Sequence, residues 1–211
     1  MAEITHGIRS ILSASIVYDA FQRLVGADAF RRKIVSDYLA TAPRSRVLDI
    51  GCGTAEILRH LPEEIEYVGF DASETYIRSA HARFGHRGTF FAQLVSDASL
   101  EALPKFDLVM AIGLVHHLGD AEANQLFAIG ARALKMGGRL CTVDPCLTEP
   151  QSSIARAIIR RDRGQNVRGP EDYRELARKH FGKVEASIRH DLLRIPYTHA
   201  ILVCSEPRAS S

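Results

Sequence analysis

Residues 47–55, Val-Leu-Asp-Ile-Gly-Cys-Gly-Thr-Ala, read as an apolar strand that runs into a turn containing two glycines. The apolar run indicates a buried strand, and we expect a helix over 54–61 directly after the turn. Gly51 and Gly53 let the backbone bend sharply and approach a ligand without a Cβ in between. Asp49 precedes the turn, where a carboxylate would repel a pyrophosphate but attract an ammonium group. The stretch therefore predicts a nucleoside ligand with a cationic tail.

Strand-like and helix-like segments alternate along the rest of the chain. The alternation predicts right-handed βαβ units and a parallel sheet. The last two strands are joined by a connection too short for a helical crossover, so we expect them to pair antiparallel. The expected strands are 46–50, 65–70, 88–95, 106–112, 138–144, 183–190 and 197–205, and the expected helices are 8–24, 27–40, 54–61, 73–84, 120–135, 152–163 and 170–180.

Five motifs in this order resemble the class I S-adenosylmethionine-dependent methyltransferases. They are the glycine turn, Tyr-Val-Gly-Phe-Asp at 67–71, Ser-Asp-Ala at 96–98, Phe-Asp-Leu-Val-Met-Ala-Ile-Gly-Leu-Val-His-His-Leu at 106–118, and Gly-Gly-Arg-Leu-Cys-Thr-Val-Asp-Pro at 137–145. The resemblance implies an α/β, Rossmann-like, doubly wound fold. Its seven-stranded sheet would be mostly parallel with an antiparallel last strand, with helices on both faces and an N-terminal helical cap. Ala55 replaces the family's third glycine, and we expect cofactor binding to survive because alanine is small.

The resemblance also implies S-adenosyl-L-methionine as cofactor and S-adenosyl-L-homocysteine as product. Asp71, at the end of the second strand, would accept hydrogen bonds from both ribose hydroxyls, since an ionised acid has two acceptor oxygens. Asp97 would reach the adenine amino group. No metal ligands are expected. The expected cofactor-binding residues are Asp49, Gly51, Cys52, Gly53, Asp71, Ala72, Asp97, Ala98 and Ile112.

Two histidines, His116 and His117, directly follow the fourth expected strand. A histidine titrates near neutral pH and suits a general base that takes a proton from a hydroxyl or an acidic carbon. Both are candidate catalytic residues, and we expect His117 to face the pocket. The alternative is that one histidine packs against the loop while the other faces the pocket without acting as a base. A carboxylate or thiol acceptor would need no base.

Positive charge and polar side chains concentrate in the last third of the chain. Residues 151–211 hold twelve Lys and Arg against seven Asp and Glu, whereas residues 46–150 hold nine against fourteen. The arginines within 156–168 indicate either a solvated helix face or a site for an anionic acceptor such as a phosphate. The segment 190–199 combines a possible His190–Asp191 pair with other polar groups near the expected pocket mouth. For His190 and Asp191 we favour the alternative, a polar turn whose members satisfy one another. The expected substrate contacts are Tyr18, Arg160, Arg194 and Tyr197.

Length and composition favour one soluble domain. The chain has 211 residues, of which 46% are hydrophobic and 25% charged, and this is ordinary for a single globular domain. We divide it into an N-terminal cap (1–45), a cofactor-binding core (46–145) and a closing segment (146–211). No apolar run approaches the roughly 20 residues of a membrane span, and no secretory signal is evident. The four cysteines lack C-x-x-C spacing, which favours reduced thiols and a cytoplasmic location.

Three classes of function follow. The leading hypothesis is a methyltransferase, monomeric or homodimeric, that moves a methyl group by in-line displacement to a small-molecule acceptor, with an anionic acceptor as one option. The second is a methyltransferase acting on nucleic acid or protein, although the chain has no N-P-P-Y or D-P-P-Y motif and no Lys-rich run, so no nucleic-acid partner is expected. The third is a non-catalytic S-adenosylmethionine-binding protein. An oxidoreductase is disfavoured by Asp49 and by the glycine spacing.

Overall fold

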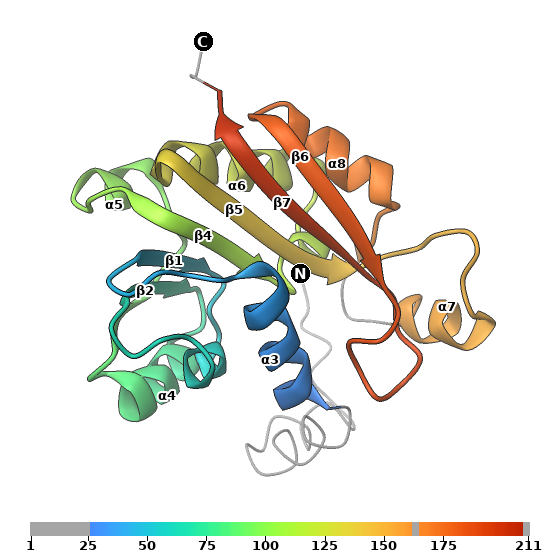
Figure 1. Cartoon of the computed structure of the whole chain (residues 1–211), viewed down its shortest axis with the longest axis horizontal. Coiled ribbons are helices and arrows are strands. Elements are labelled where there is room, and N and C mark those ends of the chain that lie inside the picture. The colour runs from blue at the N-terminus through green and yellow to red at the C-terminus, as the bar shows by residue number, and fades with distance from the viewer. Residues whose placement is uncertain (1–25, 162–164, 209–211) are drawn as a thin grey trace, which may run out of the picture.

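A single seven-stranded sheet organises the protein, whose computed structural model describes residues 26–161 and 165–208. The strand order is β3-β2-β1-β4-β5-β7-β6 (Figure 1). The first five of these strands run parallel, and β7 runs antiparallel to both β5 and β6. This confirms the expected mostly parallel sheet with an antiparallel last strand. The strands are β1 (Arg46–Ile50), β2 (Glu66–Asp71), β3 (Gly88–Ala92), β4 (Phe106–Ile112), β5 (Leu134–Pro145), β6 (Phe181–Arg189) and β7 (His199–Pro207).

Helices cover both faces of the sheet. One face packs against α3 (Ala27–Tyr38), the 3₁₀ turn η1 (Glu56–Arg59) and α4 (Glu74–Phe84). The other face packs against α6 (Asp120–Ala133) and α8 (Pro170–Arg178). The remaining short helices are α5 (Asp97–Glu101), the 3₁₀ turn η2 (Val115–His117) and α7 (Ser153–Ile159). Among the described residues, none of the helices is long and apolar enough to cross a membrane.

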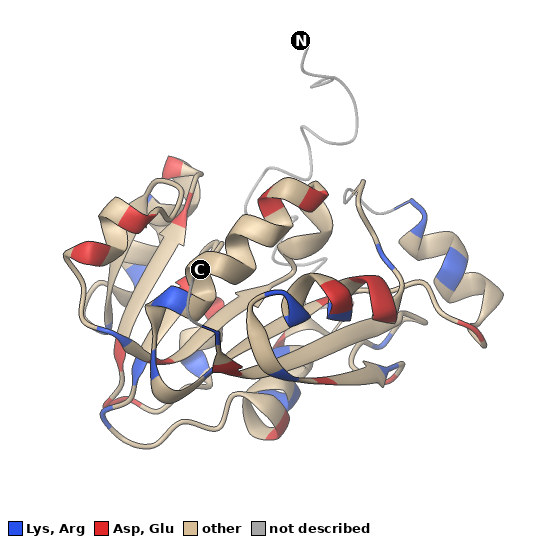
Figure 2. Cartoon of the chain, turned by 90° about the horizontal axis from the view of Figure 1, so that it is seen from above, with Lys and Arg blue, Asp and Glu red and all other residues tan. Residues whose placement is uncertain are grey.

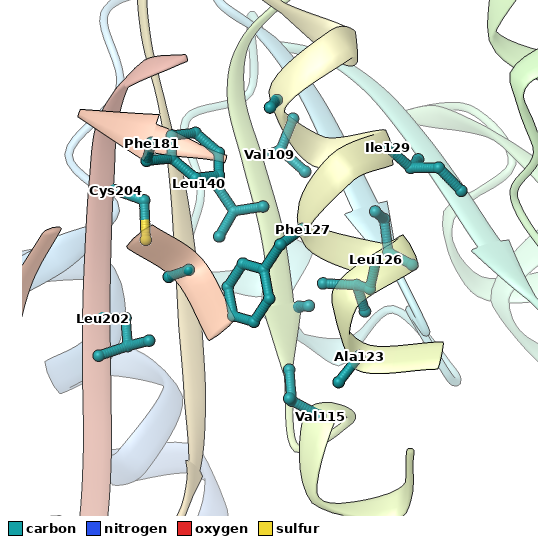
Figure 3. Packing of buried hydrophobic residues seen from close by; sticks show 14 of the residues in the cluster. Val109, Val115, Ala123, Leu126, Phe127, Ile129, Leu140, Phe181, Leu202 and Cys204 are labelled. Carbon is teal, nitrogen blue, oxygen red and sulfur yellow. The ribbon is translucent and has the colours of Figure 1, made fainter. Parts of the chain in front are cut away.

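The packing of α6 onto β4 and β5 fixes the end of β4, where the two histidines follow. Figure 3 shows Phe127 of α6 pointing toward the strands, near Leu140 of β5 and Val109 of β4, and all three side chains are fully buried. The helix comes close because it has no side chain at Gly130, where a Cβ would lie 2.3 Å from Leu140. Burying each such large side chain contributes about 1.5–3 kcal/mol. The position of β4, the strand that precedes the two histidines, is therefore fixed by its close packing against α6.

Strand order reverses between β1 and β4. The chain moves outward from β1 to β2 and β3, then returns to place β4 on the other side of β1. In open α/β sheets, ligands bind in the crevice outside the carboxyl ends of the strands at such a point. The glycine turn after β1 and the η2 turn after β4 both lie at this reversal.

Two predicted elements near the crevice were wrong. The helix expected over 54–61 is only the short η1, because Ala55 adopts a left-handed conformation (φ 55°) that interrupts a right-handed helix. The strand expected over 88–95 ends at Ala92, and the unpredicted helix α5 follows, with Ser96 capping its first turn. Both errors concern backbone that leaves regular structure at the edge of the crevice.

The remaining boundaries differ less. The helix expected over 120–135 ends at Ala133, so β5 begins at Leu134 rather than at 138. The helix expected over 152–163 is described as α7 from Ser153 to Ile159. The other expected helices and strands lie within two residues of those observed at each end. The helix expected over 8–24 lies outside the described residues, so α3 is the described part of the expected N-terminal cap.

Candidate active site

The glycine turn presents bare backbone at the end of β1. Gly51 and Gly53 have φ angles of 76° and 55°, which glycine adopts without strain. A Cβ on Gly51 would lie 2.9 Å from the side chain of Leu114, just before η2, so the two turns are in contact. A Cβ on Gly53 would meet no atom within 4 Å. The backbone around Gly53 therefore borders open space in which a ligand can approach closely.

Asp71 is oriented by the same turn. Its Oδ2 accepts a hydrogen bond of 2.9 Å from the backbone N–H of Gly53, and its Oδ1 accepts one of 2.8 Å from the N–H of Ser73. Because each carboxylate oxygen has a second lone pair, both oxygens keep acceptor capacity. A partly exposed, preoriented carboxylate at the end of β2 suits a ligand with two adjacent hydroxyls.

Asp49 lies beneath the turn and is only 4% exposed. The hydroxyl of Tyr67 donates a hydrogen bond of 2.5 Å to its Oδ2. Burial raises the pKa of Asp49 to about 7, the hydrogen bond from Tyr67 opposes the shift, and the negative charge of Asp71 adds to it. A cation bound above the turn would favour the ionised form. Asp49 therefore suits the recognition of an ammonium group.

Three other expected cofactor contacts border the crevice. Cys52 packs against β2, since a Cβ on Gly69 would lie 2.8 Å from its Sγ. Burial raises the pKa of the Cys52 thiol well above its ordinary value, so the thiol stays protonated. Ala72 is exposed directly after Asp71, and Ile112 is partly buried at the end of β4.

Asp97 is engaged elsewhere. It lies in the first turn of α5, and its two carboxylate oxygens accept hydrogen bonds of 2.8 and 3.0 Å from the guanidinium of Arg132 at the end of α6. Ala98 is exposed on the same helix. The contacts that the structure describes do not connect Asp97 or Ala98 with the glycine turn. Their role at an adenine ring stays a prediction.

The two histidines have different surroundings. His116 is 5% exposed, and its Nδ1 lies 2.8 Å from Oδ1 of Asp144, which also accepts a 3.1 Å hydrogen bond from the backbone N–H of His116. An ionised Asp144 requires a proton on Nδ1, which leaves Nε2 as the nitrogen with the lone pair. His117 is exposed, and its ring centroid lies 4.0 Å from that of His116. The structure therefore supplies an orienting carboxylate to His116, whereas the sequence reasoning preferred His117 as the pocket-facing histidine.

Asp144 itself has no role in the sequence interpretation. It is 2% exposed near the end of β5, and its Oδ2 is buried without a hydrogen-bond partner among the described residues. The sequence feature that could have identified Asp144 is its position in Val-Asp-Pro, at the carboxyl end of a central strand, where polar residues face the crevice.

Arg168 braces the turn that carries both histidines. Its side chain is 9% exposed, and its guanidinium donates hydrogen bonds of 2.7–3.1 Å to backbone carbonyls and to one carboxylate. The backbone N–H of Asn166 also donates to the carbonyl of His116 at 3.0 Å. The partners of Arg168 are the carbonyls of Val115, Leu118 and Asn166 and the carboxylate of Asp120.

The other basic residues of this segment are mostly surface groups. Arg156 contacts the carbonyl of Thr148 and the carboxylate of Glu149. Arg160 and Arg161 are exposed at the end of α7, the helix beside the grey break in Figure 2. Arg163 lies outside the described residues, as does the expected substrate contact Tyr18. The arginines therefore do not converge on one described site.

In the loop between β6 and β7, His190 and Asp191 have separate partners. Nδ1 of His190 lies 3.0 Å from the Thr198 hydroxyl, whereas the Asp191 carboxylate accepts hydrogen bonds from Arg189 and Lys33. The contacts agree with the favoured alternative of a polar turn, and Lys33 of α3 adds a partner from outside the turn.

The two expected substrate contacts in this loop lie apart. Arg194 is exposed, and its stem passes Gly26 so closely that a Cβ there would lie 2.9 Å from Cγ of Arg194. Tyr197 is 8% exposed and lines a cavity of about 360 Å³. Among the described residues, no group of three His, Cys, Asp or Glu side chains is placed to hold a metal ion.

Comparison with known proteins agrees with this geometry. Residues 47–138 match the family model described as a methyltransferase domain. The chain is 28% identical over 118 residues to cyclopropane-fatty-acyl-phospholipid synthase of Escherichia coli (strain K12), covering 54% of this chain and 30% of that protein. It is 27% identical over 144 residues to phosphoethanolamine N-methyltransferase of Triticum aestivum, covering 66% and 28%. The chain thus spans less than a third of the length of these curated relatives.

A solved structure shows the same fold. Phosphoethanolamine N-methyltransferase 2 of Haemonchus contortus, in complex with phosphomonomethylethanolamine and S-adenosylhomocysteine, superposes with a TM-score of 0.71 at 17% identity. The match covers 99% of this chain and 61% of that one. This structural match supports the expected fold.

Proposed function

We propose that the protein is a class I, S-adenosylmethionine-dependent methyltransferase that transfers a methyl group to a small-molecule acceptor, and the match of residues 47–138 to a methyltransferase domain supports this proposal. The observation that carries the proposal is the position of the His116–Asp144 pair. It follows β4 on a turn that touches the glycine turn through Leu114 and Gly51. A proton acceptor and a cofactor-binding turn thus lie side by side at the strand-order reversal.

The residues of the crevice fit the cofactor. The backbone at Gly53 leaves open space, Asp71 offers acceptors for two ribose hydroxyls, and buried Asp49 offers a carboxylate to the ammonium group. When bound, S-adenosylmethionine supplies a methyl group already activated by a sulfonium centre. The protein must then align the acceptor and exclude water.

For a hydroxyl or acidic-carbon acceptor, the chain must also remove a proton. Asp144 holds the ring of His116 through Nδ1, so Nε2 takes the acceptor's proton as the new bond to the methyl group forms. The positive charge that develops on the ring is stabilised by the buried carboxylate of Asp144. General-base assistance of this kind contributes a factor of about 10²–10⁴ to the rate.

Two of the similar proteins support an acceptor of low mass. The name of the wheat enzyme gives phosphoethanolamine, a small molecule, as its acceptor, and the Haemonchus contortus enzyme was solved with a related phosphobase. These acceptors are those of the two similar proteins. For this chain we propose only that the acceptor is also a small molecule. A macromolecular acceptor is the competing proposal.

Methyl-labelled S-adenosylmethionine tests the function directly. The purified protein is incubated with the label and a fractionated extract of its source cell, with His116→Ala run in parallel. Label that enters a low-mass fraction and falls in the variant supports the proposal. Label that enters only macromolecules would refute a small-molecule acceptor. Binding of S-adenosylhomocysteine without any transfer would favour a non-catalytic binding protein.

A further inference from the structure

We propose that the cavity of about 360 Å³ between α7 and the β6–β7 loop binds the acceptor through an uncharged, hydrogen-bond-donating group such as a hydroxyl or a carboxamide. The inference rests on the proposed methyl transfer and assigns its substrate class. The side chains that carry the argument are Gln151, Ser152 and Ala155 on one wall and His190, Tyr197 and Thr198 on the other.

The cavity lies at the same edge of the sheet as the candidate active site. One wall follows the carboxyl end of β5, and the other precedes the start of β7; Figure 1 shows α7 near the β6–β7 loop at this edge. The N–H of Cys146 donates to the carbonyl of Thr198 at 3.0 Å, and Nε2 of Gln151 donates to the carbonyl of Cys146 at 2.8 Å. Cys146 is two residues beyond Asp144, so the cavity walls and the histidine pair share one strand end.

Gln151, which lines the cavity, has a side-chain acceptor without a described partner. Its Nε2 is satisfied by Cys146, whereas its Oε1 is buried and receives no hydrogen bond from the described part of the chain. Exchanging the two amide atoms would place the oxygen against the Cys146 carbonyl, so this orientation is the favourable one. A buried acceptor without a partner costs about 1–3 kcal/mol, and an O–H or N–H group of a ligand would recover that cost.

The opposite wall adds a polar pair and an aromatic ring. Thr198 is fully buried, and its hydroxyl lies 3.0 Å from Nδ1 of His190. Tyr197 is almost fully buried, and its ring packs at a tilt of 44° to that of His199, with centroids 4.9 Å apart. The lining thus combines polar side chains with one aromatic ring.

The lining disfavours a charged acceptor. Among the residues that the structure describes, the lining contains no Lys, Arg, Asp or Glu side chain. The adjacent Arg156 is paired with Glu149, and Arg160 is exposed at the far end of α7. Burying a phosphate or an ammonium group without a counter-charge costs several kcal/mol. The anionic acceptor that the arginine cluster indicated therefore does not fit this cavity.

The volume sets a size class as well. Small-molecule sites are about 300–1,000 Å³, and this cavity lies near the lower limit. It accommodates a small ring with polar substituents.

Four single-ring fragments of similar size test the charge preference: phenol, benzoate, phenyl phosphate and benzylammonium. Binding is measured by ligand-observed NMR in saturating S-adenosylhomocysteine. Ser152→Trp blocks the cavity from its exposed rim, where Ser152 makes no capping hydrogen bond. Ile154→Trp is the matched control, because Ile154 is 62% exposed on the same helix and is absent from the lining.

We expect phenol to bind best and to lose about tenfold or more in affinity in Ser152→Trp, equal to about 1.4 kcal/mol, but not in Ile154→Trp. A preference for any charged fragment, or equal phenol binding in both variants, overturns the inference. Gln151→Met, which keeps the volume but removes the acceptor, should weaken phenol binding while leaving S-adenosylhomocysteine affinity unchanged. Unweakened phenol binding in Gln151→Met also overturns it.

The labelling assay separates this inference from the proposed function. Methyl transfer to a small molecule that Ser152→Trp leaves unchanged would overturn the cavity assignment alone. Fragment binding without methyl transfer to any acceptor would overturn the proposed function, and the assignment of the cavity to an acceptor would fail with it.

Discussion

The two halves of the crevice are built in different ways. The cofactor half (residues 46–92) relies on local features, since Asp49 pairs with Tyr67 and Asp71 with Gly53, each across 18 positions of sequence. The acceptor half (residues 106–207) joins distant segments, as the 50 positions between Arg168 and Leu118 show. The first half is a compact motif with its own signature, whereas the second exists only when the sheet is complete. Substitutions should therefore separate cofactor binding from catalysis.

The largest effect is expected at His116. His116→Ala should lower methyl transfer about 10²–10⁴-fold, because no other group is held by Asp144 to accept the proton. Cofactor affinity, measured by calorimetry with S-adenosylhomocysteine, should stay nearly constant. His117→Ala serves as the matched control with a smaller loss. If both variants lost the same share of methyl-transfer activity, the contact with Asp144 would not mark His116 as the base.

Asp71 provides the corresponding test in the cofactor half. Asp71→Ala should weaken S-adenosylhomocysteine binding by about 1.5–3 kcal/mol, since charge-assisted hydrogen bonds to the ribose are lost. The variant also frees the N–H of Gly53, which loosens the glycine turn. Glu74→Ala, an exposed acid three residues further on, controls for the loss of negative charge. Calorimetry that finds unchanged affinity in Asp71→Ala would remove this residue from the site.

Arg168 tests whether the acceptor half depends on distant contacts. Arg168→Met should lower the free energy of unfolding by about 1–3 kcal/mol, because several carbonyls lose a buried charged partner. Methyl transfer should fall while S-adenosylhomocysteine affinity is retained. Arg156→Met is the control, and its more exposed ion pair should contribute less than about 1 kcal/mol. The free energy of unfolding of both variants is measured by urea titration. An equal decrease in the two variants would contradict the stabilising role of Arg168.

The smallest effect concerns pH and Asp49. Because burial raises the pKa of Asp49 to about 7, its carboxyl is largely protonated at pH 6 and largely ionised at pH 8. The ionised form attracts the ammonium group, so S-adenosylhomocysteine affinity should rise about three- to tenfold across this range. Asp49→Asn should flatten the dependence in calorimetry. A pH dependence that persists in the variant would point to another group.

The same shift predicts how stability varies with pH. The folded protein holds the Asp49 proton more tightly than the unfolded chain, whose carboxyl titrates near 3.8. This group therefore contributes stability at low pH that is lost as pH rises from about 4 to 7. Asparagine does not titrate, so Asp49→Asn does not undergo this loss. The free energy of unfolding of the variant, measured by urea titration without ligand, should therefore rise relative to that of the native protein between about pH 4 and pH 7.

Sequence reasoning succeeded where geometry is local. Strand periodicity and the demand of a tight turn for glycine correctly predicted β1, the glycine turn and β2, whereas the role of Asp71 at a ribose, implied by the family resemblance, stays a prediction. Ala55 misled the helix prediction because its left-handed backbone depends on the surroundings and not on alanine's propensity. Asp144 was missed because its meaning depends on β4 and β5 being neighbours and on η2 turning His116 back over the strand end.

The arginines illustrate a second limit. Composition showed that basic residues concentrate in the last third of the chain, but it did not show whether their side chains point inward or toward solvent. Arg168 turned inward onto backbone carbonyls, whereas Arg160 remained on the surface. Side-chain placement of this kind depends on which carbonyls the fold leaves unpaired, and no local pattern in sequence reports that.

The position of β7 between β5 and β6 has a consequence for synthesis on the ribosome. Among the strands that the structure describes, β6 pairs only with β7, yet β6 is made first. The strands β1 to β5 can pair as they emerge, whereas β6 must wait for residues 199–207 before it gains a sheet partner. During that interval its apolar residues and unpaired backbone are open to wrong partners. The acceptor half is thus completed last, and nascent chains stalled before residue 199 should depend most on chaperones.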